Sequence, residues 1–159
     1  LKLILIMINI NVFSEEKAWS QRLKNKEFFF KKICNAFPQK YKFKNKKINL
    51  SLMLSNNKKI KILNKKFRKK NKSTDVLSFP SSLKLKILKE TYLGDIIISY
   101  NYMDDLKSKN LKIFKENVIK TFIHGFLHLL GRDHIKDKDH RKMLSEEKII
   151  LKTVISKIT

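Results

Sequence analysis

The chain has 159 residues, enough for one domain with a hydrophobic core and too few for two ordinary domains. Hydrophobic residues make up 42% of the sequence and include 11 Phe. This content excludes a disordered chain despite a formal net charge of +23. Such a basic protein attracts polyanions, above all nucleic acid. Only four of the 37 basic residues are Arg, however, and an AT-rich genome would also give many Lys, Ile, Asn and Phe codons. We expect one domain over residues 1–159 and leave the origin of the charge open.

The first ten residues, LKLILIMINI, are apolar but much shorter than the roughly 20 residues that a membrane span needs. They have no small-residue cleavage site, and we expect a buried strand at residues 3–10 rather than a signal peptide. Cys34 is the only cysteine, which excludes an internal disulfide and suits a reducing cytoplasm. Its apolar neighbours predict a small core residue rather than a nucleophile.

A helical pattern follows the first strand. Ser14, followed by two Glu, is typical of a helix start, and Pro38 lies just beyond the predicted end. The predicted face has spacings of four and three residues, with Lys26 its only polar member: Trp19, Leu23, Lys26, Phe30, Ile33 and Phe37. These spacings predict one amphipathic helix.

Alternating polarity predicts a strand at residues 48–55, and a helix is expected from Ile60 to Phe67. Short strands are expected at 76–79, ending at Pro80, and at 93–99, whereas residues 81–91 have no clear pattern. From Asn101 onward the chain is predicted to be helical, with a break at Gly131 and a last helix that has an apolar stripe from Met143 to Ile158. This order predicts an α+β fold with a small mixed β-sheet of about four strands packed with helices.

The most informative segment is HGFLHLLGRDH, residues 124–134. His124 and His128 are four residues apart and share one face of a helix that is otherwise apolar nearly all round. Two buried imidazoles need partners, and a Zn²⁺ ion bound by both is one solution. The alternative is a pair of core histidines that bind no metal.

Gly131 ends this helix, and His134 follows three residues later, close enough to fold back onto the same metal. Three imidazoles would leave the fourth zinc position open for a water molecule, as in catalytic zinc sites. They would also bind Ni²⁺ or Cu²⁺. His140 lies among charged residues, and we expect it to be exposed.

Zincin proteases have a Glu directly after the first histidine of their metal-binding helix, where it acts as general base. This chain has Gly125 there, and the absence of a proton-accepting side chain argues against peptide hydrolysis by that mechanism. The metal-binding helix is still expected in the core, so the fold is expected to be zincin-like.

A second candidate region is LNKKFRKKNKSTDVLSFP, residues 63–80. Arg68 could bind a phosphate in a bidentate manner, with Lys70 and Lys72 beside it, or could be one more charge on a basic surface helix. Thr74 and Asp75 could brace a turn. Asp95 could orient one of the histidines.

The segments HGFLHLLGRDH, STDVLSFP and LGDIIIS resemble the YbeY family of bacterial endoribonucleases, in order from about Leu63 to His134. The resemblance implies a cytoplasmic, zinc-dependent endoribonuclease specific for single strands, acting in 16S rRNA 3′-end maturation and ribosome quality control. It implies that rRNA and ribosomal particles are its partners, that His124, His128 and His134 bind zinc, and that Arg68 is functionally important. One departure is Arg132, where the family usually has an aromatic residue.

Two other functions stay open on the sequence alone. One is a ribosome-assembly factor without catalysis, in which the zinc is structural and the basic face binds rRNA. The other is a zinc hydrolase of peptides or small amides, which Gly125 disfavours.

Overall fold

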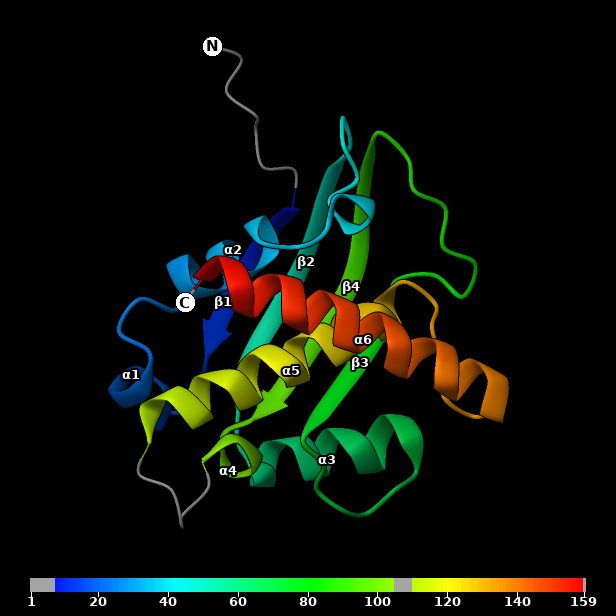
Figure 1. Ribbon diagram of the computed structural model, residues 1–159. Helices are drawn as coiled ribbons and strands as arrows, with labels where there is room; N and C mark the ends of the chain where they lie inside the picture. The colour runs from blue at the N-terminus through cyan, green and yellow to red at the C-terminus, as the bar shows by residue number, and fades with distance from the viewer. Residues whose placement is uncertain (1–7, 105–109, 159) are drawn as a thin grey trace.

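A four-stranded mixed sheet forms the centre of the computed structural model, which describes residues 8–104 and 110–158 (Figure 1). Its strands lie in the order β1-β2-β4-β3: β1 (Ile8–Ser14), β2 (Lys47–Ser55), β4 (Glu90–Ser99) and β3 (Val76–Pro80). The first three are mutually parallel, and β3 is antiparallel to β4 at one edge. The predicted small mixed sheet in an α+β fold is confirmed.

Helices cover both faces of this sheet: α1 (Ala18–Arg22), α2 (Lys26–Asn35), the 3₁₀ turn η1 (Gln39–Tyr41), α3 (Asn57–Arg68), α4 (Tyr100–Met103), α5 (Leu111–Leu129) and α6 (Asp137–Ile158). α5 crosses the sheet on one face with α6 over it (Figure 1). Phe30 and Phe37, from α2 and the turn after it, pack against Phe122 and Phe126 of α5. On the other face, α3 buries Ile60 against Leu77 and Ile97. The histidine-bearing helix thus lies in the core, as predicted.

The start of the chain differs in part from the prediction. Part of the strand expected at residues 3–10 lies outside the described residues, and the described strand β1 continues to Ser14. Ser14 is therefore not a helix start, because it pairs with Leu54 as the last residue of β1. The alternation of Ile8 and Ile10 with Asn9 and Asn11 decides this register, since only the isoleucines are buried.

The single helix predicted between Trp19 and Phe37 is wrong, because the chain breaks there into α1 and α2. Leu23 has an extended backbone, and the side chain of Asn25 accepts a hydrogen bond from the Phe28 N–H to cap α2. An Asn side chain that bonds to a backbone N–H in this way favours the start of a new helix over continuation of the preceding one. The apolar residues of the predicted face are nonetheless all buried.

The later elements agree with the sequence patterns. β2, α3, β3 and β4 occur where they were expected, and residues 81–89 form neither helix nor strand. α5 ends at Leu129, and the predicted break at Gly131 follows two residues later with a φ of +87°. The N–H groups of Gly131 and Arg132 donate to the carbonyls of His128 and Leu127, the nested pair of a Schellman ending. No helix among the described residues is long and apolar enough to cross a membrane.

Candidate metal centre

Two of the three predicted ligands project from the same side of α5. His124 and His128 are one helical turn apart, with ring centroids separated by 4.7 Å. The rest of this helix segment is held in the core by Phe122, Phe126 and Leu129, none of which is measurably exposed. This burial fixes the backbone beneath both imidazoles, so their positions do not depend on a surface loop.

His134 reaches the same place from the segment after the helix. Its ring centroid lies 5.7 Å from that of His124 and 5.1 Å from that of His128. One ligand nitrogen from each of the three rings lies within 4.8 Å of the others, close enough for one metal ion to be held by all three. The predicted convergence is therefore confirmed. His140 is exposed as predicted, although its ring lies 6.4 Å from that of His134.

Hydrogen bonds at the far ring nitrogens fix which nitrogens face the centre. Nδ1 of His124 contacts a carboxylate oxygen of Glu147, and Nδ1 of His128 lies 2.9 Å from the carbonyl oxygen of Arg132. Both partners are acceptors, so both Nδ1 atoms bear the proton and donate. In the neutral rings Nε2 is then the lone-pair atom, as in metal sites whose ligand histidines are oriented by carboxylates or carbonyls.

The two Nε2 atoms face each other at 3.1 Å. Two lone pairs at that distance repel each other unless a cation lies between them. A tetrahedral ion with Zn–N bonds of about 2.0–2.1 Å would hold two nitrogens roughly 3.3 Å apart, close to the observed separation. The donor set and its spacing therefore fit a divalent metal that prefers nitrogen ligands.

The surroundings of His128 keep its ring in the form that binds metals. Burial, followed by the neighbouring His124 and His134 and the charge of Arg68, lowers the pKa of His128 to about 4. Its ring is thus neutral at neutral pH, and a lone pair is available for a cation.

Gly125 lies against the sheet and not toward the metal centre. The Ser78 hydroxyl donates to the Gly125 carbonyl at 3.0 Å, and a Cβ at this position would lie 3.0 Å from Ile96 Cγ2 and 3.1 Å from Ser78 Oγ. A larger side chain would have to separate α5 from β3 and β4. The glycine is therefore explained by close packing, and the general base of zincin proteases has no room here.

Arg68 ends α3 near the metal centre. Its Nη2 donates to the carbonyl of Ser78 at 2.8 Å, and its guanidinium lies 5.8 Å from the ring centroid of Phe79. Because its charge contributes to the lowered pKa of His128, it lies within electrostatic reach of the histidines. Arg68 is nonetheless an exposed residue.

Lys70 and Lys72 are exposed on the loop between α3 and β3. The buried Asn64 holds this loop. Its side-chain amide donates to the Lys72 carbonyl at 2.9 Å, and its backbone carbonyl accepts from the Lys70 N–H. Asp75 braces the end of the loop as expected, accepting from Thr74 Oγ1 and from the Val76 N–H.

The expectation that Asp95 orients a histidine is wrong. Its neighbour Ile96 faces Gly125 of α5, and successive residues of a strand face opposite sides of the sheet. Asp95 therefore lies on the far side, where it accepts a hydrogen bond from Tyr92. The carboxylate that does orient a histidine is Glu147 of α6, a polar residue that lies within the stripe predicted from Met143 to Ile158.

A second group that the sequence analysis missed is a buried carboxylate beside the centre. Glu146 is paired with Arg132 and accepts from the Tyr41 hydroxyl at 3.0 Å. The presence of Arg132 in place of an aromatic residue was a usable signal, because a half-buried guanidinium needs an anion nearby.

The fold and these contacts define the class: an α+β protein in which three histidines lie close enough to hold a metal ion, a ligand set that catalytic metal sites use. A family model described as "Endoribonuclease YbeY" matches residues 11–155. Two curated relatives named Endoribonuclease YbeY are 55% identical (Pelagibacter ubique, 96% of this chain and 99% of the relative) and 37% identical (Ehrlichia canis, 89% and 88%). This chain belongs to the endoribonuclease YbeY family.

The fold has also been observed in a solved structure. The solution structure of TM1509 from Thermotoga maritima is 24% identical in sequence, covers 92% of this chain and 89% of its own, and superposes with a TM-score of 0.55. This similarity supports the fold alone.

Proposed function

We propose that this protein is a zinc-dependent endoribonuclease that cuts single-stranded RNA, acting in the cytoplasm on the 3′ end of 16S rRNA and in ribosome quality control. The single observation that supports it best is the orientation of the imidazoles: the Nε2 atoms of His124 and His128 face each other, each ring braced from behind. Family membership gives the reaction class, and the positive charge gives the kind of substrate.

His124, His128 and His134 would hold the metal, which would supply Lewis acidity and a water molecule of lowered pKa. Glu147 and the Arg132 carbonyl keep the first two rings in the required tautomer and orientation. A three-histidine set leaves a coordination position for substrate or water, unlike closed structural zinc sites, which have four protein ligands.

Arg68 would hold the scissile phosphate. Its bond to the Ser78 carbonyl fixes one end of the guanidinium, and the remaining N–H groups can bind two phosphate oxygens at once. As charge builds up on the phosphate during reaction, a fixed cation stabilises the transition state more than the ground state.

The outer face of α3 would guide the RNA backbone toward Arg68. It forms a shallow groove lined by Lys61, Ile62, Lys65, Lys66, Lys69 and Asn71. Lys70 and Lys72 are exposed on the loop that follows α3 and would add positive charge beside this groove. Binding that depends on such phosphate contacts weakens steeply as salt increases.

The test is Arg68→Lys, which keeps the charge but loses the planar fork. We expect cleavage of a single-stranded RNA to fall at least about a hundredfold, given that removal of one such transition-state contact costs on the order of 10²–10³. RNA affinity and zinc content should change little. The matched control is Arg141→Lys, because Arg141 is an exposed arginine on α6. This variant should cleave RNA at the wild-type rate.

Cleavage unaffected by both substitutions would indicate a contaminating nuclease and reject the proposal. RNA binding and zinc content with no cleavage by clean protein would instead support an assembly factor with a structural zinc. Analysis of product ends separates two routes: a 2′,3′-cyclic phosphate means attack by the RNA 2′-hydroxyl, and a 5′-phosphate means attack by water.

A further inference from the structure

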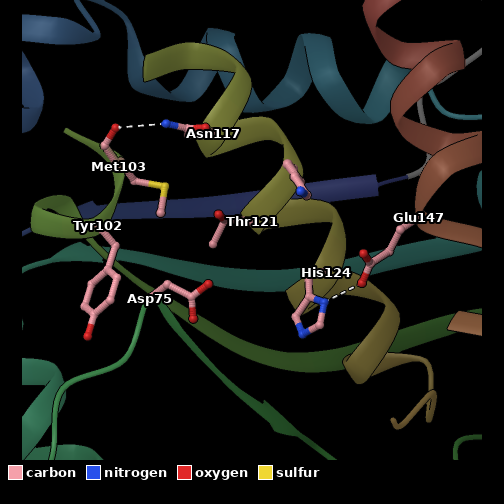
Figure 2. A pocket seen from close by; sticks show the side chains of 8 residues that line it. Asp75, Tyr102, Met103, Asn117, Thr121, His124 and Glu147 are labelled. Carbon is pink, nitrogen blue, oxygen red and sulfur yellow. Dashed lines mark hydrogen bonds and ion pairs between the residues drawn. The ribbon is translucent and has the colours of Figure 1, made fainter. Parts of the chain in front are cut away.

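A pocket of about 290 Å³ lies beside His124, where the start of β3, α4 and α5 meet (Figure 2). The residues of its lining that matter here are Asp75, Tyr102, Asn117, Lys120, Thr121 and His124. The volume is just below the roughly 300–1,000 Å³ typical of small-molecule sites. It suits one unit of a polymer better than a longer stretch of chain.

The polar wall of the pocket follows from the spacing of residues on α5. Asn117, Thr121 and His124 are separated by four and three residues, so they lie along one face of the helix. Figure 2 shows Thr121 and His124 on this helix, with Asp75 and Tyr102 across from them. The pocket therefore extends from the metal centre toward the N-terminus of α5.

Several groups in the pocket are available to a ligand. Within residues 8–104 and 110–158, the Lys120 ammonium and the Thr121 hydroxyl have no hydrogen-bond partner. Asp75 Oδ1 accepts from the Val76 N–H at 2.8 Å and from Thr74 Oγ1 at 3.2 Å, whereas Oδ2 has no hydrogen-bond partner in the described part of the chain and is left as an acceptor. The Tyr102 hydroxyl is held by Ser73 at 3.1 Å, which fixes the ring at the pocket wall.

We propose that this pocket binds the nucleotide next to the scissile phosphate, with Tyr102 against its base, Lys120 on a phosphate and Asp75 accepting from its ribose 2′-hydroxyl. A nucleotide offers a flat ring, an anion and a hydroxyl donor, and the lining has one matching group for each. A carboxylate is a common acceptor for ribose hydroxyls, and contact with the 2′-hydroxyl lets a protein distinguish RNA from DNA. The inference rests on the proposed function, because it assigns that pocket to the same substrate.

The test uses uridine 5′-monophosphate and its 2′-deoxy counterpart as probes of the zinc-loaded protein, with binding followed by NMR. Neither probe has an internucleotide bond, so binding is measured without cleavage. We expect both to shift the amide signals of Asn117, Tyr102 and Thr121, with the ribonucleotide bound about tenfold more tightly, as loss of one hydrogen bond to a charged group predicts. Equal affinity of the two probes in the wild-type protein, or shifts confined to other parts of the protein, would overturn the proposal.

Asp75→Asn tests the ribose contact in a matched way. The Val76 N–H and the Thr74 hydroxyl both need an acceptor, so they hold the Asn oxygen in the place of Oδ1 and turn its NH₂ group toward the pocket. The variant should fold normally and bind both probes equally. Lys120→Gln should lower the affinity for both probes severalfold. Lys112 is another exposed lysine on α5 that does not line the pocket, and Lys112→Gln should leave both affinities unchanged. A preference for the ribonucleotide that survives in Asp75→Asn would remove Asp75 from the proposal's mechanism and reject it.

The two proposals fail in different ways. If the probes bind in the pocket and clean protein does not cut RNA, the endoribonuclease proposal fails while the nucleotide site stands. If both Asp75→Asn and Lys120→Gln cut RNA with the wild-type rate and the wild-type KM, the proposed nucleotide site is rejected and the endoribonuclease proposal stands.

Discussion

Arg132 donates from Nε to both carboxylate oxygens of Glu146, at 3.0 and 3.2 Å. The Glu146 side chain is only 9% exposed, and its carboxylate also accepts from the Tyr41 hydroxyl. The backbone carbonyl of Arg132 in turn accepts from Nδ1 of His128. One residue therefore joins the metal centre to α6 and to η1, in a place where an aromatic side chain is usual for the family.

Replacing Arg132 with Leu should destabilise the protein, because it leaves the Glu146 carboxylate nearly buried without its cation. We expect the free energy of unfolding to fall by about 1–3 kcal/mol, the cost of an unsatisfied buried acceptor. Zinc affinity should fall severalfold as well, because the turn that presents the Arg132 carbonyl is less well held. Urea unfolding and competition with a zinc chelator measure the two effects.

The double variant Arg132→Leu/Glu146→Gln separates charge from packing. The Gln side chain is neutral and can still accept from Tyr41, so most of the lost stability should return. If the single variant is as stable as wild type, or if the double variant is no more stable than the single one, the ion pair does not have this role.

Glu147 should control how tightly the metal is bound. Its carboxylate accepts from Nδ1 of His124, and loss of such an outer partner typically lowers metal affinity about 10–100-fold. We expect a loss of that size for Glu147→Ala and a smaller one for Glu147→Gln, which keeps an acceptor. The measurement is zinc affinity by chelator competition, with metal content after dialysis as a second readout.

Glu116→Ala is the matched control, since Glu116 is a half-buried carboxylate on α5 that forms no ion pair among the residues the structure describes. It removes the same charge from the protein and should leave zinc affinity unchanged. Affinity equal to wild type in Glu147→Ala would mean that the His124–Glu147 contact does not support the metal site.

The three histidines could be predicted because their geometry is local. His124 and His128 share a helix face by spacing alone, and Gly131 reverses the chain in time for His134. Glu147 could not be found in the same way. It lies 23 residues from His124, and its approach depends on how α6 packs over α5, which no short-range pattern encodes.

The errors in the secondary structure have a similar origin. Trp19 and Phe30 lie at helical spacing, but they belong to two separate helices that bury them on the same side of the sheet. The apolar residues therefore keep a helical period although the backbone between them is not helical throughout. Asp95 was assigned to the wrong face because the pairing register of β4 decides which residues face α5. In both cases tertiary packing, which a local sequence pattern does not encode, decided the outcome.

Alkaline pH should lower the free energy of unfolding through ionisation of Tyr41. Burial, together with its hydrogen bond to Glu146 and the charge of that carboxylate, raises the pKa of Tyr41 to about 12, with Arg132 offsetting part of the rise. The folded state thus favours the neutral phenol, and this contribution is complete below the ordinary value of 10.0. It is lost as the pH rises from there to about 12, up to roughly 2 kcal/mol.

Tyr41→Phe reports this contribution, because Phe keeps the ring but cannot ionise. Its free energy of unfolding should be lower than wild type at neutral pH, since Glu146 loses a donor, and should fall less steeply above pH 10. Many lysines also titrate in that range, so the quantity to compare is the difference between the two proteins at each pH. A constant difference would exclude a role for Tyr41 in the alkaline transition.

Cys34 should be chemically inert in the folded protein. It is 1% exposed, and burial raises the pKa of its thiol, so the thiolate that reacts with thiol reagents is scarce and inaccessible. We expect labelling in native buffer to proceed only as fast as the protein opens, and at once in denaturant. Cys34→Ala should keep RNA cleavage intact, while Cys34→Ser should be the less stable variant because it buries a hydroxyl. Fast native labelling, or loss of cleavage in a well-folded Cys34→Ala protein, would mean that the thiol takes part in the chemistry and not only in packing.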